Sequence, residues 1–220
     1  MLNQEVDTEL PLISWADETT LGIITNEQGQ NMLTIKRVGS KGKQSIAIPR
    51  LSRIQSFDFK YKGRLAVLSG DLNGKSDAFV FNVNRGQIRR ITNDNYDVKD
   101  VSLVPETNVV LFSSNRTVDT VYVQGSNRLE DSEVHKFNIF SYDLDVLDTT
   151  FDKLTNALAK DVSPVATDME STYYLSDQQG INNLYRHSRT DSLSVQVSRF
   201  LYGIKHFDID VENSRLVYVS

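Results

Sequence analysis

The sequence predicts an all-β fold made of repeated four-stranded units, and two independent sets of periodic residues lead to that prediction. Five strand-like runs each close on a small hydroxyl residue, and the closing positions are 44, 45, 62 and 44 residues apart: Thr25, Ser69, Ser114, Ser176 and Ser220. Four apolar residues, each ahead of a polar turn, are 43, 63 and 43 residues apart: Ile48, Ile91, Leu154 and Val197. Both sets have one period near 44 residues and show the same expansion in the third unit.

A period of this length, with about four strands inside it, is typical of a β-propeller blade. In the second unit the strands are expected at Ile54–Lys60, Leu65–Ser69, Ala78–Val83 and Gln87–Thr92. Their connections suit antiparallel hairpins and are too short for crossover helices. A β-sandwich and a jelly roll are the all-β alternatives, but neither predicts two sets of residues that repeat in step.

We expect four full blades and about half of a fifth, so that the ring of the propeller is incomplete. The blades are expected at about 11–50, 51–94, 95–157 and 158–200, with a partial blade at 201–220, in a single domain over residues 1–220. Because propellers have about four to eight blades, we interpret the chain as a fragment of a longer protein. The alternative is an open arc closed by a second copy, since unpaired strand edges recruit strands.

Propeller geometry also predicts which strands are innermost and which side chains are buried. The innermost strands are expected at Val101–Val104, Val162–Val165 and His206–Asp210. Blades pack face to face, and large apolar side chains fill the gap between them. Nine such residues are expected in the core: Phe57, Phe59, Val67, Phe79, Leu111, Phe112, Phe140, Tyr174 and Leu184.

Short motifs recur where one unit meets the next. Arg90-Ile91-Thr92 returns as Lys153-Leu154-Thr155, and a strand ends on Ser114-Asn115-Arg116. Asn138-Ile139-Phe140 and Asn183-Leu184-Tyr185 take equivalent positions in the third strands. These motifs resemble the repeat of TolB-like β-propellers, which runs (K/R)(I/L)T, then S(D/N)R, then IY or LY.

The resemblance is to a divergent member of that family. The family's Ser-Pro-Asp-Gly turn is replaced by Pro105-Glu106 and Asp168-Met169, and the Trp-Asp pair of WD repeats is absent because Ala16 follows Trp15. The resemblance implies a bacterial repeat protein of the periplasm or cell envelope that binds other proteins.

Composition excludes several classes of function. The 24 Lys and Arg against 29 Asp and Glu give a net charge of −5, which argues against a nucleic-acid groove. The absence of Cys removes disulfides, thiolate zinc sites and Cys nucleophiles. No stretch approaches the roughly 20 apolar residues of a transmembrane segment, and the first thirty residues lack the layout of a signal peptide.

No catalytic or cofactor site is expected. The sequence has no Gly-x-Ser-x-Gly elbow, and His135, His187 and His206 lack metal-binding or triad spacing, so we interpret them as surface or packed side chains. Two carboxylate clusters have oxygen ligands that Ca²⁺ prefers, although solvated strand ends are the favoured interpretation. These clusters are Asp143, Asp145 and Asp148, and Asp208 with Asp210.

The third unit carries an insertion between its second and third strands. There, 26 positions separate the end of the second strand at Ser114 from Phe140 in the third strand, against 8 to 10 between the corresponding positions of the other units, so the extra residues are about Thr117–Lys136. Such insertions give repeat scaffolds particular functions, although drift in an exposed loop is the alternative. The candidate interaction residues are Arg128, Glu130, Asp131 and Glu133.

Two functional hypotheses follow. The first is a non-catalytic binding module whose insertion stands on the face that carries the connections between blades, at 93–97, 156–160 and 198–203. The second is the substrate-gating propeller of a larger peptidase, prolyl-oligopeptidase-like or tricorn-like, whose catalytic domain lies outside this sequence. The sequence of the complete gene distinguishes the two hypotheses.

Overall fold

The computed structural model describes residues 11–60, 64–121, 134–146, 148–210, 213 and 215–220. Over these residues the chain forms eighteen β-strands and no helix, and the strands make five antiparallel sheets.

The first sheet contains β1 (Leu12–Asp17), β2 (Thr20–Glu27), β3 (Gln30–Arg37) and β4 (Lys43–Ile48). The second contains β5 (Arg53–Lys60), β6 (Leu65–Leu72), β7 (Lys75–Asn82) and β8 (Gln87–Arg90). The third contains β9 (Val98–Leu103), β10 (Val109–Ser114), β11 (Asn138–Asp143) and β12 (Asp152–Lys153). The fourth contains β13 (Val162–Ala166), β14 (Ser171–Ser176), β15 (Asn183–Ser188) and β16 (Leu193–Gln196), and the two-stranded fifth contains β17 (His206–Asp210) and β18 (Arg215–Val219).

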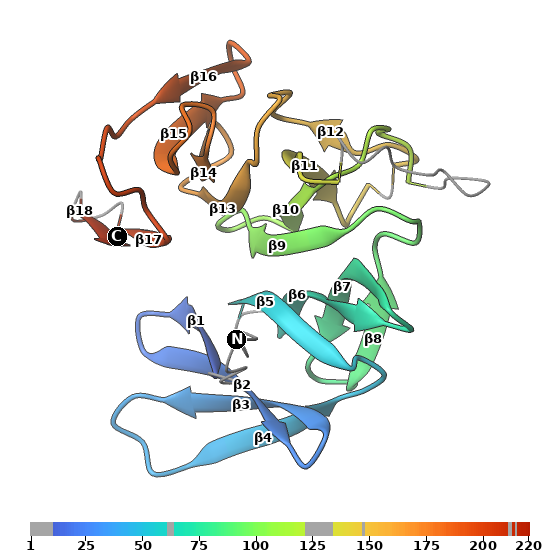
Figure 1. Cartoon of the computed structure of the whole chain (residues 1–220). Helices are drawn as coiled ribbons and strands as arrows, with labels where there is room; N and C mark the ends of the chain where they lie inside the picture. The colour runs from blue at the N-terminus through green and yellow to red at the C-terminus, as the bar shows by residue number, and fades with distance from the viewer. Residues whose placement is uncertain (1–10, 61–63, 122–133, 147, 211–212, 214) are drawn as a thin grey trace, which may run out of the picture.

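In every sheet the strands pair in chain order, so the first strand is at one edge. Figure 1 shows the sheets arranged around a common centre, with β1, β5, β9, β13 and β17 on the inside. The three strands that were expected to be innermost are β9, β13 and β17, and each belongs to a different sheet. The all-β, incomplete β-propeller predicted from the periodicity is therefore confirmed.

The second sheet also shows where the sequence prediction was wrong in detail. β6 continues to Leu72 and β7 begins at Lys75, so their hairpin is longer than the strands predicted to end at Ser69 and to begin at Ala78. The hairpin turns on Asn73-Gly74, whose φ angles are 55° and 77°. This pair is a strong two-residue hairpin signal, because both residues accept positive φ angles.

The core lies between neighbouring sheets, as expected for blades that pack face to face. All nine predicted core residues are buried, and their exposed fractions range from 0% for Phe112 to 8% for Phe57. Phe112 stacks on Phe140 with ring centroids 5.6 Å apart and meets the edge of Phe151 at 5.1 Å. These rings belong to the cluster that fills the space between the second and third sheets.

A hydroxyl residue directly follows three of the four periodic apolar residues, Ile91, Leu154 and Val197. Thr92 accepts a hydrogen bond from the Ala78 amide (3.1 Å) and donates one to the Asp77 carboxylate (2.7 Å). Thr155 makes the same pair of bonds with Ile139 and Asn138, and Ser198 makes it with Leu184 and Asn183. We call this arrangement the hydroxyl latch; it ties the end of each of these three units to its own third strand. In the first unit Pro49 stands 43 residues before Thr92 and cannot form the latch.

Candidate functional site

The innermost strands surround a central channel with a volume of about 460 Å³. All five sheets contribute side chains to its wall. Its polar residues are three carboxylates and four hydroxyls: Asp58, Asp100, Asp208, Ser14, Ser56, Ser102 and Ser163. The channel is therefore an acidic, hydroxyl-rich cleft.

Bulges in the inner strands direct some of these side chains toward the next sheet. In β5 the register shifts between Ile54 and Ser56, and in β13 it shifts between Val162 and Val165. In β9 the shift lies between Val98, which pairs with Ser114, and Val101, which pairs with Phe112. A bulge turns a side chain away from the regular alternation and increases the local twist. The polar residues Ser56, Asp100 and Ser163 lie at or beside these bulges.

Most of the channel's polar groups bind the neighbouring inner strand. Ser56 accepts a hydrogen bond from the Val101 amide at 2.8 Å, and Asp100 accepts one from the Ser163 amide at 3.1 Å. Asp58 accepts bonds from the Leu103 amide at 2.8 Å and from the Ser14 hydroxyl at 2.9 Å. These bonds join β1 to β5, β5 to β9 and β9 to β13, so the channel wall also holds the sheets together.

Burial affects the charge of one carboxylate in the channel, that of Asp58. Burial raises the pKa of Asp58, the negative charge of Asp208 raises it further, and the hydrogen bonds from Leu103 and Ser14 oppose both effects. The hydroxyl of Ser102 is buried and has no hydrogen-bond partner among the described residues. No histidine lines the described part of the channel, so its serines have no imidazole base beside them.

The root of the insertion is built on a buried arginine. Arg116 pairs with Asp94 at 2.7 Å, and both side chains are almost completely buried. Its guanidinium also donates to the carbonyls of Val118 (2.9 Å) and Thr120 (3.1 Å) and lies 4.2 Å from the centroid of the Phe151 ring. Sequence reasoning identified Arg116 as part of a motif, but a buried charge could not be recognised without its partner.

Both described ends of the insertion lie where they were expected. Near its start, the Thr117 hydroxyl bonds to Tyr96 at 2.7 Å, which brings it against the connection at 93–97. Just after its end, Phe137 donates its amide hydrogen to the Ala159 carbonyl at 3.1 Å, in the connection at 156–160. The insertion therefore emerges on the face that carries these two connections. The candidate residues Arg128, Glu130, Asp131 and Glu133 lie outside the described residues.

The histidines and the paired aspartates do not come together into a site. His187 is buried and bonds to Ser194 at 3.1 Å, and burial lowers the pKa of its imidazole, with Arg189 adding to the effect. Asp145 binds the Asn108 amide, and Asp210 binds Asn213 in a turn. Over the described part of the chain, no three His, Asp or Glu side chains lie close enough to hold a metal ion.

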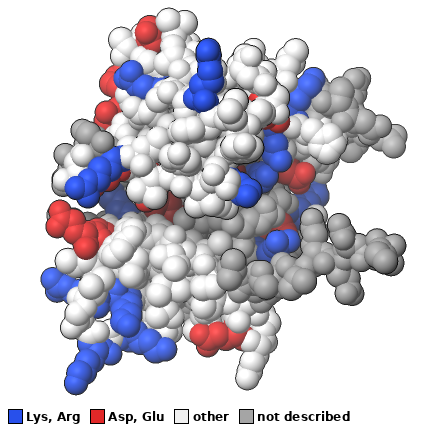
Figure 2. Space-filling model, turned by 60° about the vertical axis from the view of Figure 1, so that its left-hand side comes forward, with Lys and Arg blue, Asp and Glu red and all other residues white. Residues whose placement is uncertain are grey.

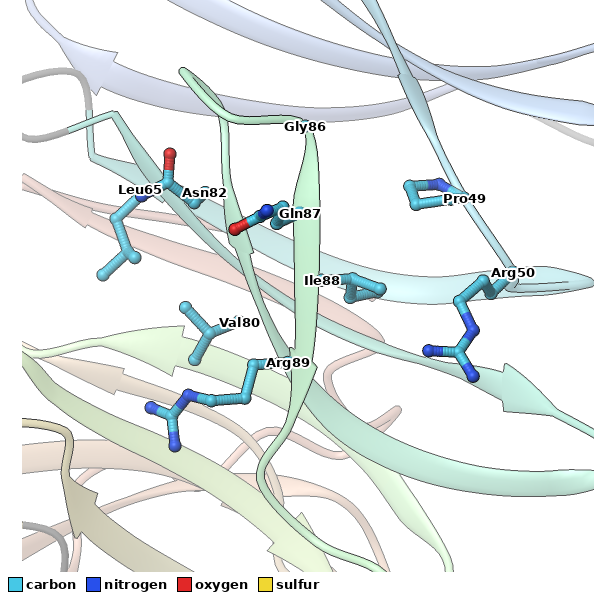
Figure 3. Close-up of a pocket in the computed structure, with 9 residues that line it drawn as sticks. All are labelled: Pro49, Arg50, Leu65, Val80, Asn82, Gly86, Gln87, Ile88 and Arg89. Carbon is cyan, nitrogen blue, oxygen red and sulfur yellow. The ribbon is translucent and has the colours of Figure 1, made fainter.

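Two further observations concern the surface. A hollow of about 500 Å³ lies at β8. In Figure 3 the labelled side chains of Arg50 and Arg89 lie on opposite sides of this strand and do not point toward one another. Figure 2 shows Lys and Arg as well as Asp and Glu on one face, with several Lys and Arg side chains close together at its lower left. Over the described residues there is no helix of the length and apolarity needed to cross a membrane.

Comparison with known proteins gives likeness in structure only. No protein-family model and no curated protein matches the sequence. A protein assigned as TolB from Agrobacterium tumefaciens is similar with a TM-score of 0.71 and 17% identity, over 96% of this chain and 69% of that chain. TolB from Acinetobacter baumannii is similar with a TM-score of 0.63 and 13% identity, over 85% of this chain and 43% of that chain. A structure from a study of two prolyl endopeptidases is similar with a TM-score of 0.55 and 12% identity, over 89% of this chain and 28% of that chain.

The chain therefore has a TolB-like β-propeller fold, as the repeat motifs indicated. It spans 69% of the Agrobacterium protein but only 43% and 28% of the other two chains. The fold defines a propeller module, in which sheets surround a channel and connections between sheets gather on its faces.

Proposed function

We propose that this chain is a non-catalytic TolB-like propeller module that binds a protein or another ligand of the cell envelope. The chemistry of the central channel carries the proposal. Ser56, Asp58 and Asp100 are bonded to backbone amides of neighbouring strands, which suits them to positioning strands and not to proton transfer. No histidine lines the described channel wall, so the usual base for a serine nucleophile is missing from it.

The insertion supports a binding role and suggests where the partner docks. Its described start is anchored by Arg116, and Val121 and Phe151 form backbone bonds with Thr149 and Asp119. Anchoring of this kind argues against the alternative that the insertion is only a sequence change tolerated in an exposed loop. We propose that Arg128, Glu130, Asp131 and Glu133 contact the partner, since charges at a rim tune partner choice and association rate.

The test compares cross-linking of the chain to proteins of a bacterial envelope extract before and after the insertion is altered. One variant replaces residues 122–133 by a short Gly-Ser linker, and a second carries R128Q, E130Q, D131N and E133Q. We expect the first variant to lose the cross-linked product, and the second to weaken it and to make it less sensitive to salt.

The matched control is Glu106→Gln, a change of charge at an exposed turn between β9 and β10. It should bind as the unaltered chain does. If the linker variant captures the same product with the same yield, the insertion is not the docking element.

Likeness to a prolyl endopeptidase structure favours a second candidate function, the substrate-gating propeller of a larger peptidase such as a prolyl-oligopeptidase-like or tricorn-like enzyme. The full-length gene product then contains a serine nucleophile outside this chain. A fluorophosphonate probe should label that product if the second function is correct and leave it unlabelled if the first is.

We also propose that residues 1–220 form one propeller domain and that the protein acts in the periplasm or cell envelope of a bacterium. The TolB-like fold supports this setting. Fractionation of cells that express the complete gene tests it, because a product found only with cytoplasmic markers would contradict the proposal.

A further inference from the structure

Asp161 is a carboxylate in an environment that does not compensate its charge. Its exposed fraction is 0%, and neither carboxylate oxygen has a hydrogen-bond partner among the described residues. In the two preceding units the equivalent positions, at intervals of 63 and 44 residues, are the buried apolar residues Val98 and Ile54. Burying an apolar side chain is favourable, whereas burying an unpaired ionised carboxylate is costly.

The groups around Asp161 are hydroxyls, amides and other acids. The side chains of Ser176, Thr155 and Gln178 lie next to it, and their polarity partly offsets the effect of burial. The titratable groups that face it are Asp177, beyond the end of β14, and the phenols Tyr174 and Tyr185 of β14 and β15.

These neighbours bring no positive charge to the carboxylate. Burial raises the pKa of Tyr174 to about 12, so that phenol stays neutral, and Asp177 adds only negative charge. The nearest cation along the chain, Lys160, has its ammonium group beside that of Lys99 on β9.

The backbone at Asp161 is part of the joint between the third and fourth sheets. Its amide donates to the Phe137 carbonyl at 2.9 Å, and the Phe137 amide donates to the Ala159 carbonyl at 3.1 Å. The Lys160 amide donates to Asp177 at 2.8 Å. One short segment therefore holds both the strand that follows the insertion and the turn after β14.

We propose that Asp161 is a buried proton-binding site that makes this joint, and with it the root of the insertion, sensitive to pH. With the proton bound, the side chain is neutral and the joint is closed. When the proton leaves, a negative charge forms between the sheets with no counterion, and the joint weakens.

The sign of the effect follows from burial, which raises the pKa of Asp161 above the ordinary value near 4 that it has in the unfolded chain. The folded protein therefore holds this proton more tightly than the unfolded chain does. The stability that results is fully present below the unfolded pKa and is lost as the pH rises through the folded pKa.

The experiment follows thermal unfolding of the full 220-residue chain between pH 3.5 and 8 for the unaltered protein and for Asp161→Asn. The two should melt together at the acid end. The variant should then gain about 3–5 °C over the unaltered protein for each pH unit, until the folded pKa is passed. Glu18→Gln makes the same chemical change at an exposed turn and should show no such gain.

Three further results decide the proposal. Amide exchange at Phe137, relative to the Asp161→Asn variant, should accelerate with rising pH if the joint opens there. A gap in melting temperature that stays constant with pH overturns the proposal. So does a rise in melting temperature with CaCl₂ or NaCl at pH 7 that Asp161→Asn abolishes, because a cation and not a proton would then neutralise the carboxylate.

Discussion

The charge of Arg116 is buried together with that of Asp94. Two of its nitrogens bond to Asp94 and to the carbonyls of Val118 and Thr120, while Nη1 has no partner. Such a pair adds little net stability compared with apolar residues, but removing one member leaves an uncompensated charge.

We therefore expect Asp94→Asn to lower the free energy of unfolding by about 3–5 kcal/mol, measured by urea denaturation. The control is Asp152→Asn, because Asp152 faces Arg189 at 4.0 Å with 79% of its side chain exposed. That change should cost less than about 1 kcal/mol. Equal losses in the two variants would contradict the role given to the buried pair.

Phe112 tests the core at the same scale. It is fully buried against Phe140 and Phe151, so Phe112→Ala should cost about 3–5 kcal/mol of unfolding free energy through lost burial and the cavity left behind. Leu158→Ala is the matched control, since Leu158 is 88% exposed. An unchanged melting temperature for Phe112→Ala would show that the ring is not packed as described.

At the scale of the element, the hydroxyl latch explains why a small polar residue follows the fourth strand in three successive units. The hydroxyl serves as the acceptor for a backbone amide in the third strand, and leaving a buried amide without a partner is costly. Thr92, Thr155 and Ser198 each supply one oxygen that accepts from that amide and one proton that the preceding Asp or Asn accepts.

Thr92→Val keeps the shape of the side chain and removes both bonds of the latch. We expect a loss of about 1–3 kcal/mol in unfolding free energy, the usual cost of a buried donor left unpaired. Thr34→Val, which removes an exposed hydroxyl bonded to Ser45, should change stability by much less. If the two variants are equally stable, the latch does not contribute to the fold.

At the scale of the whole molecule, the inner strands combine two roles. Their bulges and side-chain bonds fasten each sheet to the next, and the same residues make the channel acidic. The insertion is added outside this frame, between β10 and β11, where the other four-stranded sheets have short connections.

Replacing residues 122–133 by a short Gly-Ser linker should therefore leave the fold intact. The Arg116 anchor and the bonds at Val121 and Phe137 remain in the variant. Circular dichroism and the melting temperature should match those of the unaltered chain. A large loss of stability would mean that the insertion is part of the fold and not an addition to it.

The repeat could be predicted from the sequence because it rests on local rules. Alternation of apolar and polar residues predicts strands, and a fixed period predicts identical units, so the sheets and the nine buried residues followed without a structure. The hairpin at Asn73-Gly74 was missed although its signal is local, because the neighbouring strands were assigned by apolar content alone.

Pattern alone was thus sufficient for the class of fold, the order of the strands and the position of the insertion. The bonds between sheets were not predictable, because Asp58 and Leu103 are 45 residues apart and Asp100 and Ser163 are 63 apart. The same holds for the charge state of a buried side chain. Asp94 pairs with Arg116, whereas Asp161 has no cation beside it among the described residues. The residues next to these two aspartates in the sequence do not reveal that difference. Only the tertiary structure decides it, because the energy of a buried charge depends on which groups the fold brings beside it.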